Sequence, residues 1–258
     1  MAMTPRPRRS ILYMSGSNAR ALEKGRSLAA DGLIFDLEDS VAPDAKETAR
    51  SQILDALNEG GYGHRELIVR VNAMDSPWGK KDITTMATSG AHGILLPKVN
   101  SAVMVQEAEA LMAASNAPDE MTIWTMMETP LGILHGKEIA FSSPRMEAFV
   151  LGTSDLAKDL HCAHTQERLP MITSLGLCML AARAAGIDVI DGVHPDLSDD
   201  EGFEYSCRQG LEMGFDGKTL IHPKTIEMAN NVYTPSEDEL QWSRIIIAAH
   251  GQAEKEGQ

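Results

Sequence analysis

Two acidic side chains each follow a short apolar segment of the chain. Glu128 ends the segment MTIWTMME, and Asp155 follows VLGTS. Apolar runs that stop at an acid followed by turn residues predict β-strands that present the acid at their carboxyl ends. In a parallel α/β fold these ends carry the chemistry, because the loops beyond them can close over a ligand. An oxygen-only pair without histidine favours a hard cation such as Mg²⁺ over zinc.

The motif around Glu128 is also compatible with a purely structural role. In ETPLG, Thr129 could cap a helix whose first residue is Pro130. We favour the functional interpretation, because strand ends of this kind commonly form active sites.

A cationic residue, Arg70, ends the apolar run ELIVR. Its guanidinium could bind a substrate carboxylate through two parallel hydrogen bonds. An internal ion pair with a neighbouring acid is an equally good interpretation. Glu38 and Asp39 follow the run GLIFDL, and we expect them either to orient water bound to the metal or to cap the next helix.

Three further polar residues follow predicted strands. Lys98 comes after GILLP, and a lysine there either forms a Schiff base with a carbonyl substrate or lies on the surface. His194 and His222 each precede a proline, and this dipeptide is more typical of a turn than of a catalytic base.

Strand-length apolar runs alternate with amphipathic segments along the chain. We expect strands within residues 11–14, 32–37, 66–72, 93–99, 121–132, 148–152, 188–193 and 217–221. We expect helices at residues 19–30, 45–57, 80–88, 102–114, 133–140, 171–185, 199–213 and 237–253. This alternation predicts one (β/α)8 TIM barrel domain over residues 1–258 with a C-terminal helical region. A doubly wound sheet is less favoured, because SGSN after the first strand lacks the GxGxxG spacing.

Composition restricts the partners and the compartment. The net charge of −14 and a pI near 5.0 argue against nucleic acid or an anionic membrane as the main partner. The three cysteines show no CxxC spacing, so neither a disulfide framework nor a zinc ribbon is indicated. The apolar run at residues 11–14 is too short for a signal peptide or a membrane span. We therefore expect a soluble, cytoplasmic protein.

Several longer motifs carry a family resemblance. They are GLIFDLEDSV, IVRVN, ILLPKV, METPLGI, LGTSDLA and AARAAGIDVIDGV, within a match that runs from RRSILYMSG to TLIHPKTIEMANNVYTPS. With these motifs, the chain resembles the citrate lyase β-subunit-like branch of the HpcH/HpaI aldolase family, which includes malyl-CoA, citramalyl-CoA and citryl lyases.

This resemblance implies a function and a site. It implies a (β/α)8 barrel that binds Mg²⁺ through Glu128 and Asp155, with Arg70 on substrate oxygens and Glu38 and Asp39 in support. The implied reaction is metal-dependent C–C cleavage of a short 3-hydroxyacyl-CoA, or of a thioester on an acyl carrier protein, to acetyl-CoA and an oxo acid. A homotrimer or hexamer is implied as well. The alternatives are a CoA-binding or complex-forming subunit with little activity alone, and a Schiff-base aldolase that uses Lys98.

The chain also departs from longer relatives in the family. Malyl-CoA lyases carry a C-terminal extension whose aspartate enters the neighbouring subunit's site, whereas this sequence ends at HGQAEKEGQ. The proton donor is therefore unassigned, and malate-synthase-like or thioesterase activity is less expected. Ser15 replaces the usual proline before the first-loop glycine, so we expect the loop near the site, and with it the substrate contacts, to differ from those of the family.

Overall fold

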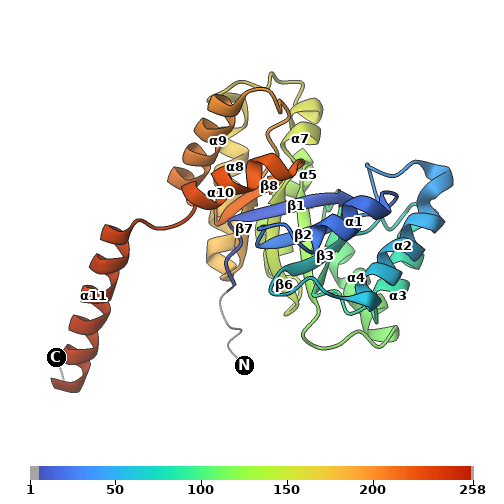
Figure 1. Ribbon diagram of the computed structural model, residues 1–258, viewed down its shortest axis with the longest axis horizontal. Helices are drawn as coiled ribbons and strands as arrows, with labels where there is room; N and C mark the ends of the chain where they lie inside the picture. Colours follow the sequence, from blue (N-terminus) through green and yellow to red (C-terminus); the bar gives the residue numbers. More distant parts are fainter. Residues whose placement is uncertain (1–5, 257–258) are drawn as a thin grey trace.

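A closed barrel of eight parallel strands forms the centre of the protein (Figure 1). The computed structural model describes residues 6–256. Each strand pairs with the next in sequence, and β8 pairs with β1 to close the barrel. The strands are β1 (Ser10–Ser15), β2 (Gly32–Asp36), β3 (Glu66–Arg70), β4 (Gly93–Leu96), β5 (Thr122–Met127), β6 (Met146–Leu151), β7 (Asp188–Asp191) and β8 (Gly217–Leu220). The predicted (β/α)8 barrel is confirmed.

Helices follow the strands, and all but the last of them cover the outside of the barrel (Figure 1). They are α1 (Ala19–Gly25), α2 (Lys46–Glu59), α3 (Gly79–Met86), α4 (Ala102–Ala114), α5 (Pro130–Leu134), α6 (Gly136–Ala140), α7 (Thr153–Asp159), α8 (Ile172–Ala185), α9 (Asp200–Met213), α10 (Ile226–Val232) and α11 (Glu237–Glu256). Short 3₁₀ turns precede α2, α8 and α10 at Pro43–Ala45, Leu169–Met171 and Pro223–Thr225.

Each predicted strand overlaps an observed one, but the helix predictions were less accurate. The helix expected at residues 19–30 ends at Gly25, which lies so close to Met14 that a Cβ would be 2.8 Å from its sulfur. The helix expected at 133–140 is interrupted at His135, whose Nδ1 lies 2.8 Å from the carbonyl oxygen of Asn100. Helices α7 and α10, each seven residues long, were not predicted.

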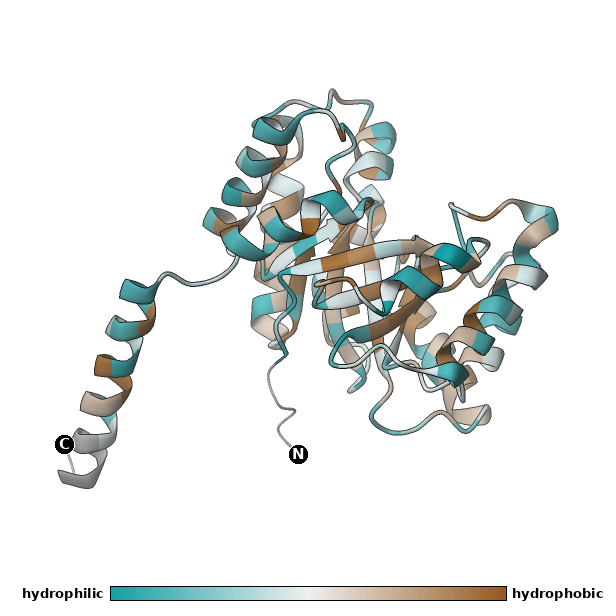
Figure 2. Cartoon of the chain, viewed as in Figure 1, coloured by the Kyte–Doolittle hydropathy of each residue, from teal (hydrophilic) through white to brown (hydrophobic). Residues whose placement is uncertain are grey.

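Two apolar layers follow from the alternation of side chains along the strands. One face of each strand points outward to the helices and forms the larger core. The strands of the barrel accordingly carry brown, hydrophobic stretches in Figure 2. The other face fills the barrel interior with Ile11, Ile34, Ile68, Leu95, Trp124, Met126, Ala148, Val150 and Ile190. The interior is therefore packed, which keeps the strand ends fixed relative to one another.

An ion-pair network around Arg8 occupies the amino-terminal end of the barrel. Arg8 bonds Glu66 at 2.8 and 2.9 Å, and Glu147 and Asp188 at 2.7 Å each. Its guanidinium also stacks 5.0 Å from the centre of the Trp124 ring. Because the arginine and Glu66 are buried, removing the cation would leave carboxylates without their partner.

Helix α11 extends away from the barrel after α10 (Figure 1). Its side chains Trp242, Ile245, Ile246 and Ile247 are exposed. Among residues 6–256, no helix is both long and apolar enough to cross a membrane.

The Arg8 network makes a stability prediction. We expect Arg8→Met to destabilise the fold by about 3–5 kcal/mol, because it leaves Glu66 buried and uncompensated. The control is Arg208→Met, since Arg208 is exposed and pairs with Glu204 on its own helix. Urea unfolding followed by circular dichroism measures both variants. Equal unfolding midpoints for the two variants would contradict the assigned role of Arg8.

Candidate active site

The carboxyl ends of the strands surround a cavity of about 360 Å³. Four of the predicted site residues line it, namely Asp39, Arg70, Glu128 and Asp155. They come from segments after β2, at the end of β3, after β5 and in the first turn of α7. The barrel therefore brings together residues separated by more than a hundred positions in sequence.

Glu128 lies just after β5 and is buried. Thr129 caps α5 by accepting a hydrogen bond from the Gly132 N–H, and Pro130 is the first helical residue. The capping interpretation of ETPLG is thus correct for Thr129, while Glu128 does not cap the helix and lines the cavity. Gly152 makes room for it, because a Cβ there would lie 2.4 Å from Glu128 Oε2.

The backbone of Lys98 positions Glu128. The Lys98 N–H donates to Glu128 Oε1 at 2.7 Å. Lys98 adopts a left-handed conformation with φ of 51°, which is unfavourable for a residue with a Cβ. Such strain is retained where the surrounding structure requires it, commonly at functional sites.

Arg70 forms an internal ion pair, which is one of the two roles that the sequence predicts for it. Its Nε and Nη2 each lie 2.7 Å from an oxygen of Asp36, in a bidentate pair between adjacent strands. Nη1 lies 3.2 Å from Glu38 and 3.7 Å from Asp39, and the Tyr13 ring stacks 4.7 Å from the guanidinium carbon. The guanidinium is therefore held rigidly at the cavity wall.

Glu38 is buried between two cations. Besides Arg70, it contacts Lys98 Nζ at 3.1 Å, yet its Oε2 makes no hydrogen bond. Burial favours the neutral Lys98 amine, but the Glu38 and Asp39 carboxylates outweigh it and hold the Lys98 pKa above its usual value. A Schiff-base lysine needs the opposite shift, so this environment works against that alternative.

We call the opening at the carboxyl ends of the strands, with its cavity, the mouth of the barrel. The acids there are electrostatically frustrated, because burial and neighbouring negative charges disfavour ionisation of Glu128. Burial raises the pKa of Glu128 to about 7, and the nearby charges of Glu38 and Asp155 add to the rise, while the Lys98 N–H and the Arg70 charge oppose it. A cation beside Glu128 and Asp155 would relieve this frustration.

The donor set fits a hard divalent cation. Glu128 and Asp155 supply carboxylate oxygens on one cavity wall, as Mg²⁺ prefers. No group of three or more metal-ligating His, Cys, Asp or Glu residues occurs within residues 6–256. A site with two protein ligands would leave coordination positions for substrate and water, which is usual for Mg²⁺.

The two predicted histidines have different surroundings. His222 caps the turn before α10, since its Nδ1 accepts from the Lys224 N–H at 3.1 Å. His194 lines a separate cavity with Asp199. The turn interpretation of the histidine–proline pair is thus correct for His222.

The sequence interpretation missed Asp36 and Tyr13, which also line the mouth cavity. Asp36 is a charged residue inside the buried strand GLIFD. That burial was a usable signal, because an acid in such a strand requires a cationic partner. The partner itself follows only from the parallel register, which places Asp36 beside Arg70.

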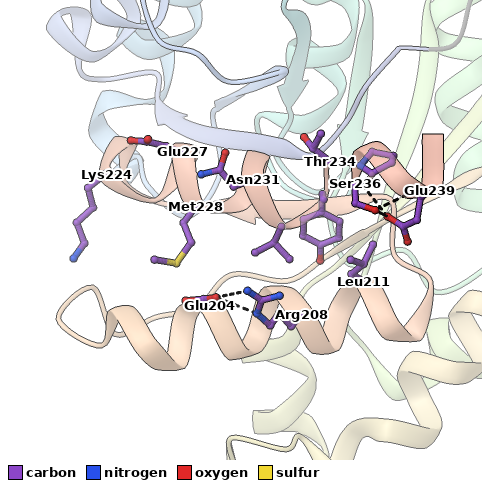
Figure 3. Close-up of a pocket in the computed structure, with 13 residues that line it drawn as sticks. Glu204, Arg208, Leu211, Lys224, Glu227, Met228, Asn231, Thr234, Ser236 and Glu239 are labelled. Atoms are coloured by element: carbon purple, nitrogen blue, oxygen red, sulfur yellow. Dashed lines mark hydrogen bonds and ion pairs between the residues drawn. The ribbon is translucent and has the colours of Figure 1, made fainter. Parts of the chain in front are cut away.

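A larger cavity lies away from the strand ends. It has a volume of about 960 Å³ and lies between α9 and α10 near the start of α11 (Figure 3). Several of its polar groups pair with one another, as Arg208 does with Glu204 and Ser236 with Glu239. The mouth cavity, with its frustrated acids, is therefore the better candidate for chemistry.

The chain is similar to known proteins over most of its length. Residues 9–223 match the family model described as HpcH/HpaI aldolase/citrate lyase. A (3S)-malyl-CoA thioesterase of Cereibacter sphaeroides is 48% identical over 258 residues, which are 100% of this chain and 88% of that protein. The citrate lyase subunit beta of Escherichia coli is 37% identical over 257 residues, 98% of this chain and 85% of that protein.

Solved structures show the same relationship. CitE from Mycobacterium tuberculosis, in complex with magnesium, acetoacetate and coenzyme A, superposes with a TM-score of 0.74 at 28% identity. The match covers 94% of this chain and 87% of CitE. RipC from Yersinia pestis gives a TM-score of 0.76 at 27% identity, with 90% and 97% covered. With its barrel, its mouth carboxylates and these matches, the chain belongs to the HpcH/HpaI aldolase/citrate lyase family.

Proposed function

We propose that the protein is a Mg²⁺-dependent lyase that cleaves a C–C bond in a short 3-hydroxyacyl-CoA, such as malyl-CoA, citramalyl-CoA or citryl-CoA. The products would be acetyl-CoA and an oxo acid. The observation that carries the proposal is the convergence of Glu128, Asp155 and Arg70 on one cavity at the barrel mouth. The magnesium and coenzyme A in the CitE complex support the same ligand classes.

The chain's residues have distinct roles in this proposal. Glu128 and Asp155 would hold Mg²⁺, which as a Lewis acid lowers the pKa of the substrate hydroxyl and stabilises the new carbonyl. Arg70 would face the thioester enolate, the second product of bond cleavage, and offset its negative charge. Its pair with Asp36 fixes the guanidinium in advance, so little reorganisation is needed during reaction. Glu38 positions Arg70 and Lys98 through one ion pair with each of them.

Thioester hydrolysis is a second candidate function. The observation that favours it is the 48% identity to a (3S)-malyl-CoA thioesterase, which weighs against our expectation from the sequence that thioesterase activity is less favoured. Both reactions start from a bound 3-hydroxyacyl thioester, but they break different bonds. The products therefore distinguish them.

The experiment is a product assay by mass spectrometry on malyl-CoA, citramalyl-CoA and citryl-CoA, with and without EDTA. Cleavage to acetyl-CoA and an oxo acid that stops with EDTA supports the lyase. Free CoA with an intact hydroxy acid supports the thioesterase. No turnover, together with tight CoA binding and activity only after addition of an acyl-carrier partner, would instead identify a complex-forming subunit.

A homo-oligomer, trimeric or hexameric, is also part of the proposal. The exposed apolar residues of α11 are its support, because association between copies would cover them. Light scattering of the purified protein measures the molar mass, and a monomer at micromolar concentration would contradict this part.

The two metal-binding carboxylates make a mutational prediction. We expect Glu128→Gln and Asp155→Asn each to reduce kcat by on the order of 100-fold or more, with the unfolding midpoint little changed, because each removes a charge from the metal site. The matched control is Asp159→Asn, which alters an exposed acid on the same helix as Asp155. Activity near the original level in either mouth variant would show that the metal lies elsewhere.

The raised pKa of Glu128 makes a pH prediction. Metal binds the ionised carboxylate, so protons compete with Mg²⁺ below a pKa of about 7. We expect Mg²⁺ affinity to be about tenfold weaker at pH 6 than at pH 8, because only about one-tenth of the carboxyl is ionised at pH 6. Isothermal titration calorimetry across this range measures the affinity. A flat profile between these pH values would contradict the assignment of Glu128 as ligand.

A further inference from the structure

We infer that a second cavity beside the mouth is an anion subsite, built to hold carboxylate or phosphate oxygens against Arg168. The cavity has a volume of about 240 Å³. It lies between the segment after β7, the segment before α8 and the start of α9. Nothing in the proposed reaction uses Arg168.

Arg168 belongs to a buried cluster with more cations than anions. The Asp191 side chain is fully buried, with Lys218 Nζ at 2.8 Å on one oxygen and Arg168 Nη1 at 2.6 Å on the other. Two buried cations thus share one buried carboxylate, which leaves a net positive charge inside the fold. A buried net charge is costly unless a counter-charge is present.

Arg168 also has an unsatisfied donor. Its Nε donates to Gln209 at 2.7 Å, but its buried Nη2 has no hydrogen-bond partner. The arginine is only 6% exposed and lines the cavity. A guanidinium donates and never accepts, so only an acceptor can satisfy Nη2.

His194 adds a second unsatisfied nitrogen to the same cavity. Its Nε2 is buried without a hydrogen-bond partner, and Asp199 Oδ2 lies 3.7 Å from it. Asp199 is the acid on this wall, and its Oδ1 already accepts from the Gly202 N–H at 2.9 Å. Burial and the Lys218 charge lower the pKa of His194, so the ring is neutral and offers a donor in the tautomer that carries its proton on Nε2. In that tautomer His194 and Arg168 both offer donors, a combination that suits an oxyanion.

The position of the cavity links it to the mouth. Thr153 and Val193 line both cavities. An anion held by Arg168 would therefore lie beside the substrate. It would be either a free anion or an anionic group of the thioester itself, and the second source alone depends on the proposed function.

Calorimetric titration of the full-length protein with inorganic phosphate tests the subsite. We expect saturable 1:1 binding that weakens at least tenfold in Arg168→Lys, which keeps the charge near Asp191 but removes the second donor arm. The matched control, Arg208→Lys, changes an exposed arginine on α9 that bonds Glu204 on the same helix (Figure 3). Its binding should equal that of the unaltered protein.

A second variant guards against misfolding of the first. Ser206→Leu places a larger side chain in the cavity from α9 and leaves the Arg168–Asp191 pair intact. It too should lose phosphate binding. Absence of saturable binding in the unaltered protein, or binding that survives in both Arg168→Lys and Ser206→Leu, overturns the inference.

Competition distinguishes the two sources of the anion. If acetyl-CoA displaces phosphate, the subsite holds an anionic group of the thioester; if both bind together, it holds a free anion. Either result supports the subsite. Phosphate binding without turnover of any thioester would refute the proposed function and leave the subsite standing.

Discussion

The buried negative charge of Glu128 is the constraint on which the mouth depends. A carboxylate removed from water must be compensated, and within residues 6–256 Glu128 accepts one hydrogen bond, from the Lys98 N–H. That bond requires a left-handed backbone at Lys98, and the space for the carboxylate requires a glycine at position 152. The left-handed backbone of Lys98, the glycine at position 152 and the raised pKa of Glu128 all accompany the burial of this one acid.

In contrast to Glu128, the nearby cation Arg70 has a buried partner of opposite charge within the protein. Arg70 is held by Asp36 across two adjacent strands, so its position does not depend on a ligand. Glu38 then connects Arg70 to Lys98, which keeps the lysine charged. The mouth thus combines a fixed cation with acids that lack sufficient partners, an arrangement that favours binding of a metal and an anionic substrate together.

The two ends of the barrel differ in how completely their buried polar groups are hydrogen-bonded. At the amino-terminal end, Arg8 donates hydrogen bonds from all three of its nitrogens to three carboxylates. At the carboxyl-terminal end, Glu38 Oε2 and Arg168 Nη2 are buried without a hydrogen bond, although Glu38 Oε2 lies 3.2 Å from Arg70 Nη1 in an ion pair. The satisfied network stabilises the fold, whereas the unsatisfied atoms beside the strand ends are candidate contacts for a ligand.

The sequence by itself determined the barrel, the approximate strands and the presence of Glu128, Asp155 and Arg70 at one mouth. It could do so because alternating apolar runs encode strands, and parallel strands place their carboxyl ends together. Only the tertiary structure decided that Asp36 is the partner of Arg70, that Lys98 holds Glu128 through its backbone, and that Arg168 meets Asp191. These contacts depend on strand register and loop conformation, which bring together residues that no local pattern relates.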